Sequence, residues 1–171
     1  TYRWGVPERA GPGPADPTSI AWLYHSHVDE PADTNAGLIG AIIVTGKGKA
    51  NPDATPRDIE QEFVTLFTVF DENASLYAEE NLHSLSNATD ELAEDEDFAE
   101  SNLMHGINGY LWGNLRSLEM RKGERVRWHT LALGTEVDLH TPHWHGMTGL
   151  SYGRRLDVTE LLPGSSITVD F

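Results

Sequence analysis

The segment Glu62-Phe-Val-Thr-Leu-Phe-Thr-Val-Phe70 decides the fold class of this chain of 171 residues. Every residue after Glu62 is β-branched, aromatic or leucine. Such residues are enriched in strands, because they fit a pleated and half-buried surface. The segment therefore predicts a strand in the interior of a sheet.

Other short apolar runs on both sides of this segment also predict strands. They lie at residues 1–6, 20–25, 37–45, 104–107, 125–133, 137–146 and 166–171. Asn108-Gly109 predicts a tight hairpin turn, and residues 29–35 read as a polar turn. A short helix is expected near residues 79–85, and no long amphipathic helix competes. This pattern, with 16 Gly and 9 Pro, predicts an all-β sandwich or barrel.

The sequence divides at a segment rich in Gly, Pro and Asn. We predict a first piece at residues 1–50, a linker at 51–60 and a second piece at 61–171. The first piece holds about three strands, too few to close a sandwich alone, so both pieces are expected to be partial domains. The acidic run at residues 91–100 is interpreted as a solvated face.

Charge and composition exclude several functions. The formal net charge of −15 argues against binding nucleic acid, whose phosphates would be repelled. No run of 18 apolar residues is present, so no membrane span is predicted, and no signal peptide is recognised. We interpret the chain as a mature or cut piece. With no cysteine, disulfides and thiolate metal sites are excluded within these residues.

Two histidine clusters carry the chemistry: His25-Ser-His27, and His140-Thr-Pro-His143-Trp-His145. They hold five of the eight histidines. An alternating His-x-His on a strand directs both imidazoles to one face, where neutral ring nitrogens suit soft or borderline metal ions such as copper. Trp144 is then expected to point to the opposite face and to pack under the strand.

The remaining histidines have simpler interpretations. His83 needs no metal, and His129 is expected to lie within a strand, in packing or in a backbone hydrogen bond. His105 is raised as a candidate only by the resemblance described next.

Five segments, in order, resemble the multicopper oxidases, above all the ceruloplasmin and hephaestin branch and the bacterial two-domain laccases. They are YRWGVPERAGPGPADP, AWLYHSHVDEPADTNAGLIGAIIV, QEFVTLFTVFDEN, ESNLMHGINGYLWGNL and GTEVDLHTPHWHG. The resemblance implies cupredoxin-like Greek-key β-sandwich domains. It also implies that this chain holds the middle two of four copper-binding segments, from the end of a first domain and the start of a last one.

The resemblance also implies a set of copper ligands. His25 and His27 would bind the type 3 copper pair. His140 would bind the type 1 copper, His143 the type 2 copper and His145 a type 3 copper. The type 1 cysteine, second histidine and axial methionine have no counterpart here. A blue-copper centre needs a thiolate, so this chain alone is not expected to be blue.

A second set of residues resembles the iron site of the ferroxidase branch. Glu100 and His105 of ESNLMH occupy the positions that bind the reducing metal. Glu136 matches a glutamate that reaches such a site from a neighbouring domain. Carboxylate and imidazole ligands suit an exchangeable ferrous ion.

The implied activity is the one-electron oxidation of a phenol or of ferrous iron, coupled to the four-electron reduction of dioxygen to water. No catalytic residue beyond the copper ligands is predicted, although Asp29, Glu30 and Asp138 are candidates for fixing imidazole tautomers or moving protons. The implied assembly is a homotrimer, with missing segments or a second chain completing the sites, and the implied location is secreted or periplasmic.

Two alternatives stay open. The first is a catalytically silent cupredoxin module, which would keep the fold and lose most of its copper. The second is a copper nitrite reductase, which lacks a paired type 3 site and does not fit the YHSH segment.

Overall fold

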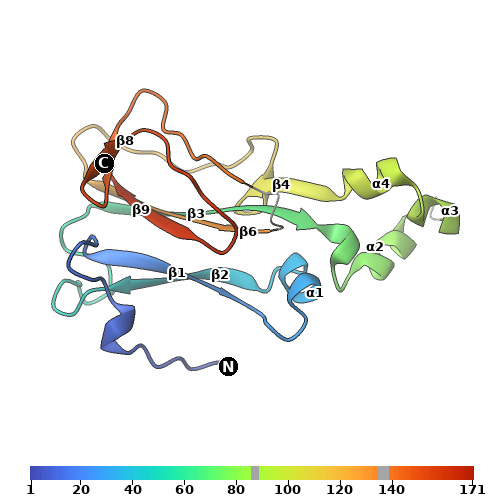
Figure 1. Ribbon diagram of the computed structural model, residues 1–171, viewed down its shortest axis with the longest axis horizontal. Coiled ribbons are helices and arrows are strands. Elements are labelled where there is room, and N and C mark those ends of the chain that lie inside the picture. The colour runs from blue at the N-terminus through green and yellow to red at the C-terminus, as the bar shows by residue number, and fades with distance from the viewer. Residues whose placement is uncertain (86–88, 135–138) are drawn as a thin grey trace.

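The structure is a computed structural model that describes residues 1–85, 89–134 and 139–171. Its main element is a seven-stranded sheet in the order β5-β4-β3-β6-β9-β7-β8 (Figure 1). Neighbouring strands are antiparallel except for β3 and β6, which are parallel. The strands are β3 (Gln61–Asp71), β4 (Leu103–Ile107), β5 (Tyr110–Leu111), β6 (Val126–Leu133), β7 (Gly149–Ser151), β8 (Arg154–Leu156) and β9 (Ser166–Asp170).

A second layer is formed by an antiparallel hairpin of β1 (Ser19–His25) and β2 (Ile39–Thr45), paired from Ser19↔Thr45 to His25↔Ile39. The hairpin lies along one face of the large sheet (Figure 1), and β1 contacts both β6 and β9. The Ser166 hydroxyl donates to the Ala21 carbonyl at 3.0 Å and so joins the layers. The predicted all-β class is confirmed, while the division into two partial domains stays a prediction.

Within the described residues, six short helical segments accompany the sheets: η1 (Glu8–Ala10), α1 (Glu30–Asn35), η2 (Glu72–Ala74), α2 (Ala78–Ser84), α3 (Asp90–Ala93) and α4 (Glu96–Ser101). The described residues of 72–101, here called the acidic arm, extend past the end of β3 and β4 (Figure 1). α2 confirms the helix expected near residues 79–85. The acidic run is mostly exposed, as predicted, but it is helical, because the Asp95 carboxylate accepts from the Phe98 N–H at 2.8 Å and caps α4.

No helix in the described parts of the chain is both long enough and apolar enough to cross a membrane.

Three local predictions are wrong. Residues 1–6 form no strand, because no neighbouring strand pairs with them, and Tyr2 is 89% exposed. Within residues 29–35, Glu30–Asn35 form the helix α1 and not a turn, because the Asp29 side chain accepts from the Ala32 N–H as the N-cap and Pro31 occupies the first turn. Described residues 139–146 make isolated bridges at His140 and His143 but no continuous strand.

The predicted turn at Asn108-Gly109 is confirmed. Both residues have positive φ, +53° and +76°, as a two-residue hairpin turn requires. Ile107 pairs with Tyr110 across it. The Asn108 side chain also accepts from the Leu66 N–H at 2.7 Å and donates to the Val64 carbonyl at 2.9 Å. The turn is therefore fastened to the middle of β3.

A buried guanidinium joins the hairpin to the large sheet. Arg127 of β6 is 1% exposed and donates to both carboxylate oxygens of Asp170, at 2.6 and 2.8 Å. It also donates to the hydroxyls of Thr18 and Ser19, at 2.8 and 2.9 Å, and lies 3.6 Å from Asp58. These hydrogen bonds offset the cost of burying the charge.

A second polar group lies beside the first. His129 is fully buried, with Nε2 2.9 Å from Glu62 and Nδ1 3.1 Å from the Thr168 hydroxyl. The Ser19 hydroxyl donates to the same Glu62 oxygen at 2.7 Å. The structural interpretation of His129 is confirmed, except that its hydrogen bonds go to side chains and not to the backbone.

The Arg127 pair yields a stability prediction. Asp170→Asn leaves the guanidinium buried with weaker partners, and we expect the free energy of unfolding to fall by about 2–4 kcal/mol. The expected loss is smaller than the full cost of breaking a buried ion pair, because Asp170 is one-third exposed and Asp58 remains as a second carboxylate beside the guanidinium. Urea unfolding measures the change. Glu60→Gln, which breaks the exposed pair with Arg125, is the control; an equal loss there would contradict the prediction.

Glu62 yields a pH prediction. Burial raises the pKa of its carboxyl, but the hydrogen bonds from His129 and Ser19 outweigh burial and leave the pKa lowered. A folded-state pKa below the unfolded value of about 4.3 stabilises the fold above that pH, and the contribution is lost as pH falls through the folded pKa. Urea titrations at descending pH should therefore show a steeper loss of stability for wild type than for Glu62→Gln. Parallel curves would show that Glu62 is not the group responsible.

Candidate metal centre

The first histidine cluster lies where the β1–β2 hairpin opens. His25 is the last residue of β1, and the Ser26 N–H donates to the Leu38 carbonyl just beyond it, at 3.0 Å. The centroids of the His25 and His27 rings are 5.7 Å apart. The side chain of His27 is 84% exposed, against 24% for His25. Because the ladder ends here, the two imidazoles lie close together and free of the core.

The surroundings of His25 determine which ring nitrogen is free. Nδ1 lies 2.8 Å from the Ser26 carbonyl oxygen. A carbonyl only accepts, so Nδ1 carries the proton and Nε2 keeps a lone pair for a metal. Glu30 reaches both rings, at 3.4 Å from His25 Nδ1 and 3.9 Å from His27 Nε2. Asp29, the other candidate here, caps α1 instead.

The second cluster is held by two isolated bridges. His140 pairs with Leu161 through two backbone hydrogen bonds of 3.0 and 2.9 Å, and His143 pairs with Val158. The His143 and His145 rings are exposed, with centroids 5.9 Å apart and planes at 89°. Two bridges therefore anchor the segment while its last two imidazoles face solvent.

His140 is the residue whose surroundings most favour a ligand. Its Nε2 atom is buried and has no hydrogen-bond partner among the described residues. Phe67 lies against the ring, with centroids 5.8 Å apart. Leaving a buried polar atom unsatisfied costs about 1–3 kcal/mol. A bound metal would satisfy such a nitrogen, and neutral imidazoles are a donor set that copper accepts.

Trp144 lies under the second cluster, as predicted. It is 8% exposed and packs against Trp128 and Phe171, with ring centroids 5.9 and 5.2 Å away. Since its neighbours in sequence, His143 and His145, are exposed, the alternation expected of a strand holds locally although the segment is not a strand.

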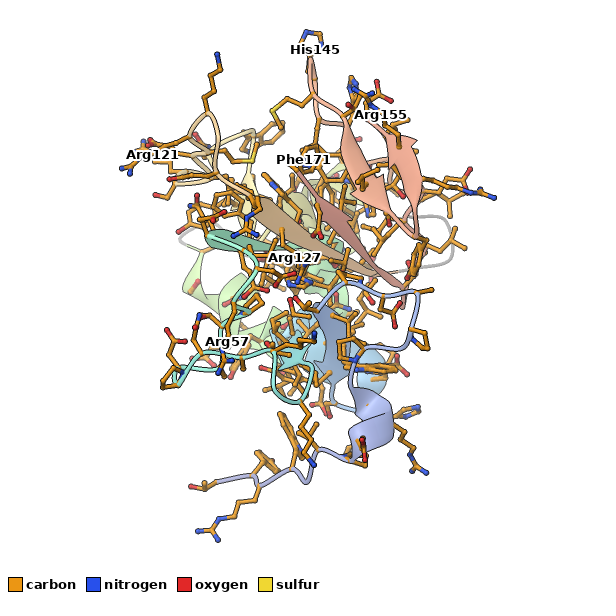
Figure 2. All side chains as sticks on the ribbon, turned by 90° about the vertical axis from the view of Figure 1, so that its left-hand side faces the viewer. Arg57, Arg121, Arg127, His145, Arg155 and Phe171 are labelled. Atoms are coloured by element: carbon orange, nitrogen blue, oxygen red, sulfur yellow. The ribbon has the colours of Figure 1, made fainter. Side chains whose placement is uncertain are left out.

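The chain presents its histidines in separate groups. Among the described residues, no three His, Asp or Glu side chains are grouped closely enough to hold a metal ion. Figure 2 shows His145 at the top of the molecule, away from the blue hairpin that carries His25 and His27. Within one copy, therefore, the predicted ligands do not converge.

The predicted iron ligands are spread over two elements. Glu100 lies on α4 and His105 on β4 opposite Val69, and both are exposed. Glu136 and Asp138 lie outside the described residues. The sequence named Glu30 as a candidate partner of the imidazoles, and it lies beside both His25 and His27. The pairing of Glu62 with His129 carried no sequence signal.

Comparison with known proteins establishes the class. No family model matches the chain. Over 99% of its length it is 45% identical to human hephaestin and 42% identical to human ferroxidase HEPHL1. A solved blue copper oxidase from Nitrosomonas europaea shares the fold, with a TM-score of 0.58 at 16% identity over 93% of this chain and 46% of that one.

The chain belongs to the multicopper oxidases, a family of oxidoreductases. Within it the two human relatives belong to the branch that the sequence motifs predicted, and the cupredoxin-like fold is confirmed. The chain spans about 15% of the length of these curated relatives.

Trp144 and His145 give a matched pair of substitutions. Trp144→Ala removes a buried indole and should lower the free energy of unfolding by about 3–5 kcal/mol. His145→Ala removes an exposed ring and should change it by less than about 0.5 kcal/mol. Thermal and urea unfolding of the two variants test the assignment, which fails if His145 proves the more costly.

Proposed function

We propose that this chain forms part of a copper-dependent oxidase that couples one-electron oxidation of a reductant to the four-electron reduction of dioxygen to water. The observation that carries the proposal is the placement of five histidines in two short segments. His27, His143 and His145 are exposed, His25 is partly exposed, and the buried Nε2 atom of His140 has no hydrogen-bond partner among the described residues. A merely structural histidine would have a partner, as His129 has. Membership of the family supports the same chemistry.

The proposed ligands follow the family pattern. His25 and His27 would hold type 3 copper, with the Ser26 carbonyl orienting His25. His140 would hold type 1 copper, His143 type 2 copper and His145 type 3 copper. Bound copper would supply the one-electron redox steps. The protein's own part is to hold the imidazoles: Asp157 lies 3.8 Å from His143 Nε2, and the Leu161 backbone fixes His140.

Ferrous iron is the favoured reductant, and a phenol is the other. Glu100 of α4 and His105 of β4 are both exposed, where an exchangeable ion could enter, and Glu136 belongs to the same proposed site. One relative carries the word ferroxidase in its name. A homotrimer, in which the missing ligands come from other segments or subunits, and a secreted or periplasmic location complete the proposal.

Copper binding tests the function. We expect the full protein to bind copper and to consume oxygen when given ferrous iron, and His27→Ala and His145→Ala to lose most of both, because each removes a ligand. His83→Ala, an exposed histidine on α2, should leave both unchanged. Metal analysis, electron paramagnetic resonance and oxygen uptake make the measurements. A protein that binds copper at neither cluster would instead be a silent module.

A further inference from the structure

The indole of Trp128 on β6 has an unusual hydrogen-bond partner. Its Nε1–H donates to the sulfur of Met120 at 3.3 Å, and no other acceptor for this group is found among the described residues. A thioether sulfur is a weak acceptor, whereas an indole N–H that is removed from water normally has a good one. The donor is therefore only partly satisfied, and a stronger acceptor at the same place would satisfy it fully.

Met120 lies where a small oxidant can reach it. It is partly exposed, in the irregular segment between β5 and β6, directly before a turn in which the Glu124 N–H donates to the Arg121 carbonyl at 3.1 Å. Its neighbours in sequence, Glu119 and Arg121, are exposed and line an open pocket, and Figure 2 shows Arg121 at the surface. Because Glu60 and Glu124 line the same pocket, a neutral oxidant would enter it more readily than an anionic one.

The other two methionines lack such a donor. Met104 and Met147 are partly exposed, as Met120 is. Met104 lies on β4 opposite Phe70, and the Met147 N–H donates to the Trp144 carbonyl at 3.1 Å in a turn. Among the described residues, only the sulfur of Met120 accepts a hydrogen bond. Exposure therefore does not distinguish the three methionines, but the neighbouring indole does.

We propose that Met120 is a reversible oxidation site, at which hydrogen peroxide converts the thioether to a sulfoxide that the indole of Trp128 then holds. The sulfur loses two electrons and gains one oxygen atom, the O–O bond breaks, and the peroxide leaves as water. The new oxygen is a far better acceptor than the sulfur, and it forms where the N–H already points. Methionine has three rotatable bonds, so the sulfur can withdraw slightly to make room.

Trp128 connects this sulfur to the packing beneath the second histidine cluster. Its ring lies against Phe63, with centroids 4.9 Å apart, and meets Trp144 edge to face, with centroids 5.9 Å apart and planes at 82°. Trp144 separates His143 from His145 in the sequence. A sulfoxide without a partner would disrupt such packing, but here it completes a hydrogen bond. We therefore expect the aromatic cluster to stay packed after oxidation, whether or not copper is bound.

A variant with a single methionine isolates the reaction. The chain has three methionines, so Met104→Leu with Met147→Leu leaves only Met120, and leucine nearly conserves the volume. We treat this full-length variant with hydrogen peroxide in EDTA. Its mass should rise by one oxygen atom and return to the starting value with methionine sulfoxide reductases.

Nuclear magnetic resonance of the isotope-labelled variant shows where the new oxygen lies. The indole N–H resonance of Trp128 should shift downfield on oxidation, because its acceptor becomes stronger. The resonances of the exposed Trp4 and Trp112 should stay in place. Trp128→Phe identifies the resonance by its disappearance.

Two substitutions of Met120 test the hydrogen bond without any oxidant. Met120→Gln offers an amide oxygen to the indole and should reproduce the downfield shift, with a urea midpoint at or above that of wild type. Met120→Leu offers no acceptor and should lower the midpoint, because the indole N–H is left unsatisfied. Oxidation should likewise lower the midpoint of the single-methionine variant only when Trp128→Phe has removed the donor.

Three results would overturn the proposal. The first is a single-methionine variant that resists peroxide under conditions that oxidise free methionine. The second is a sulfoxide that forms without a shift of the Trp128 resonance, or with loss of folded structure. The third, which needs no folded Trp128→Phe protein, is a lower urea midpoint for Met120→Gln than for Met120→Leu.

Discussion

The placement of one positive charge inside the protein governs how the two layers meet. Arg127 is inaccessible to water, so its guanidinium requires hydrogen-bond acceptors, and the large sheet alone supplies only Asp170. The Nη1 group donates to Thr18 and Ser19 at the start of β1, and Asp58 lies 3.6 Å from Nη2. Because these bonds are directional, the hairpin has one position and one register on the sheet. An apolar interface of the same area would allow sliding.

The candidate metal ligands lie outside the region in which Arg127 and its partners join the two layers. Polar side chains between the layers are paired with one another, as Glu62 and His129 are. His25 is the last residue of β1 to pair with β2, and His27 lies beyond it. His143 forms an isolated bridge, and His145 follows two residues later. None of these four rings is buried between the layers, and the Nδ1 atom of His25 bonds only to the neighbouring Ser26 carbonyl. The architecture thus separates histidines that stabilise the layers from histidines that remain free for ligands.

Much of this arrangement could be predicted from the sequence, and the failures have identifiable causes. β3 and β6 were predictable because long runs of β-branched and aromatic residues have few other conformations. The direction of Trp144 followed from alternation. α1 was missed because its cap, Asp29, resembles a turn residue, and β7 and β8 because three residues are too few to form a pattern. The contact of Arg127 with Ser19 joins residues far apart in sequence, and single-sequence patterns carry no signal for that.

The parallel pairing of β3 with β6 has a consequence for how this fold tolerates change. A parallel pair requires a crossover connection, and here the crossover contains the acidic arm, β4 and β5. The entropy of closing such a connection grows only with the logarithm of its length. Insertions or deletions in the arm therefore cost the sheet little. Over evolutionary time, the arm is where this scaffold can lengthen, shorten or change charge while the strands on either side keep their partners.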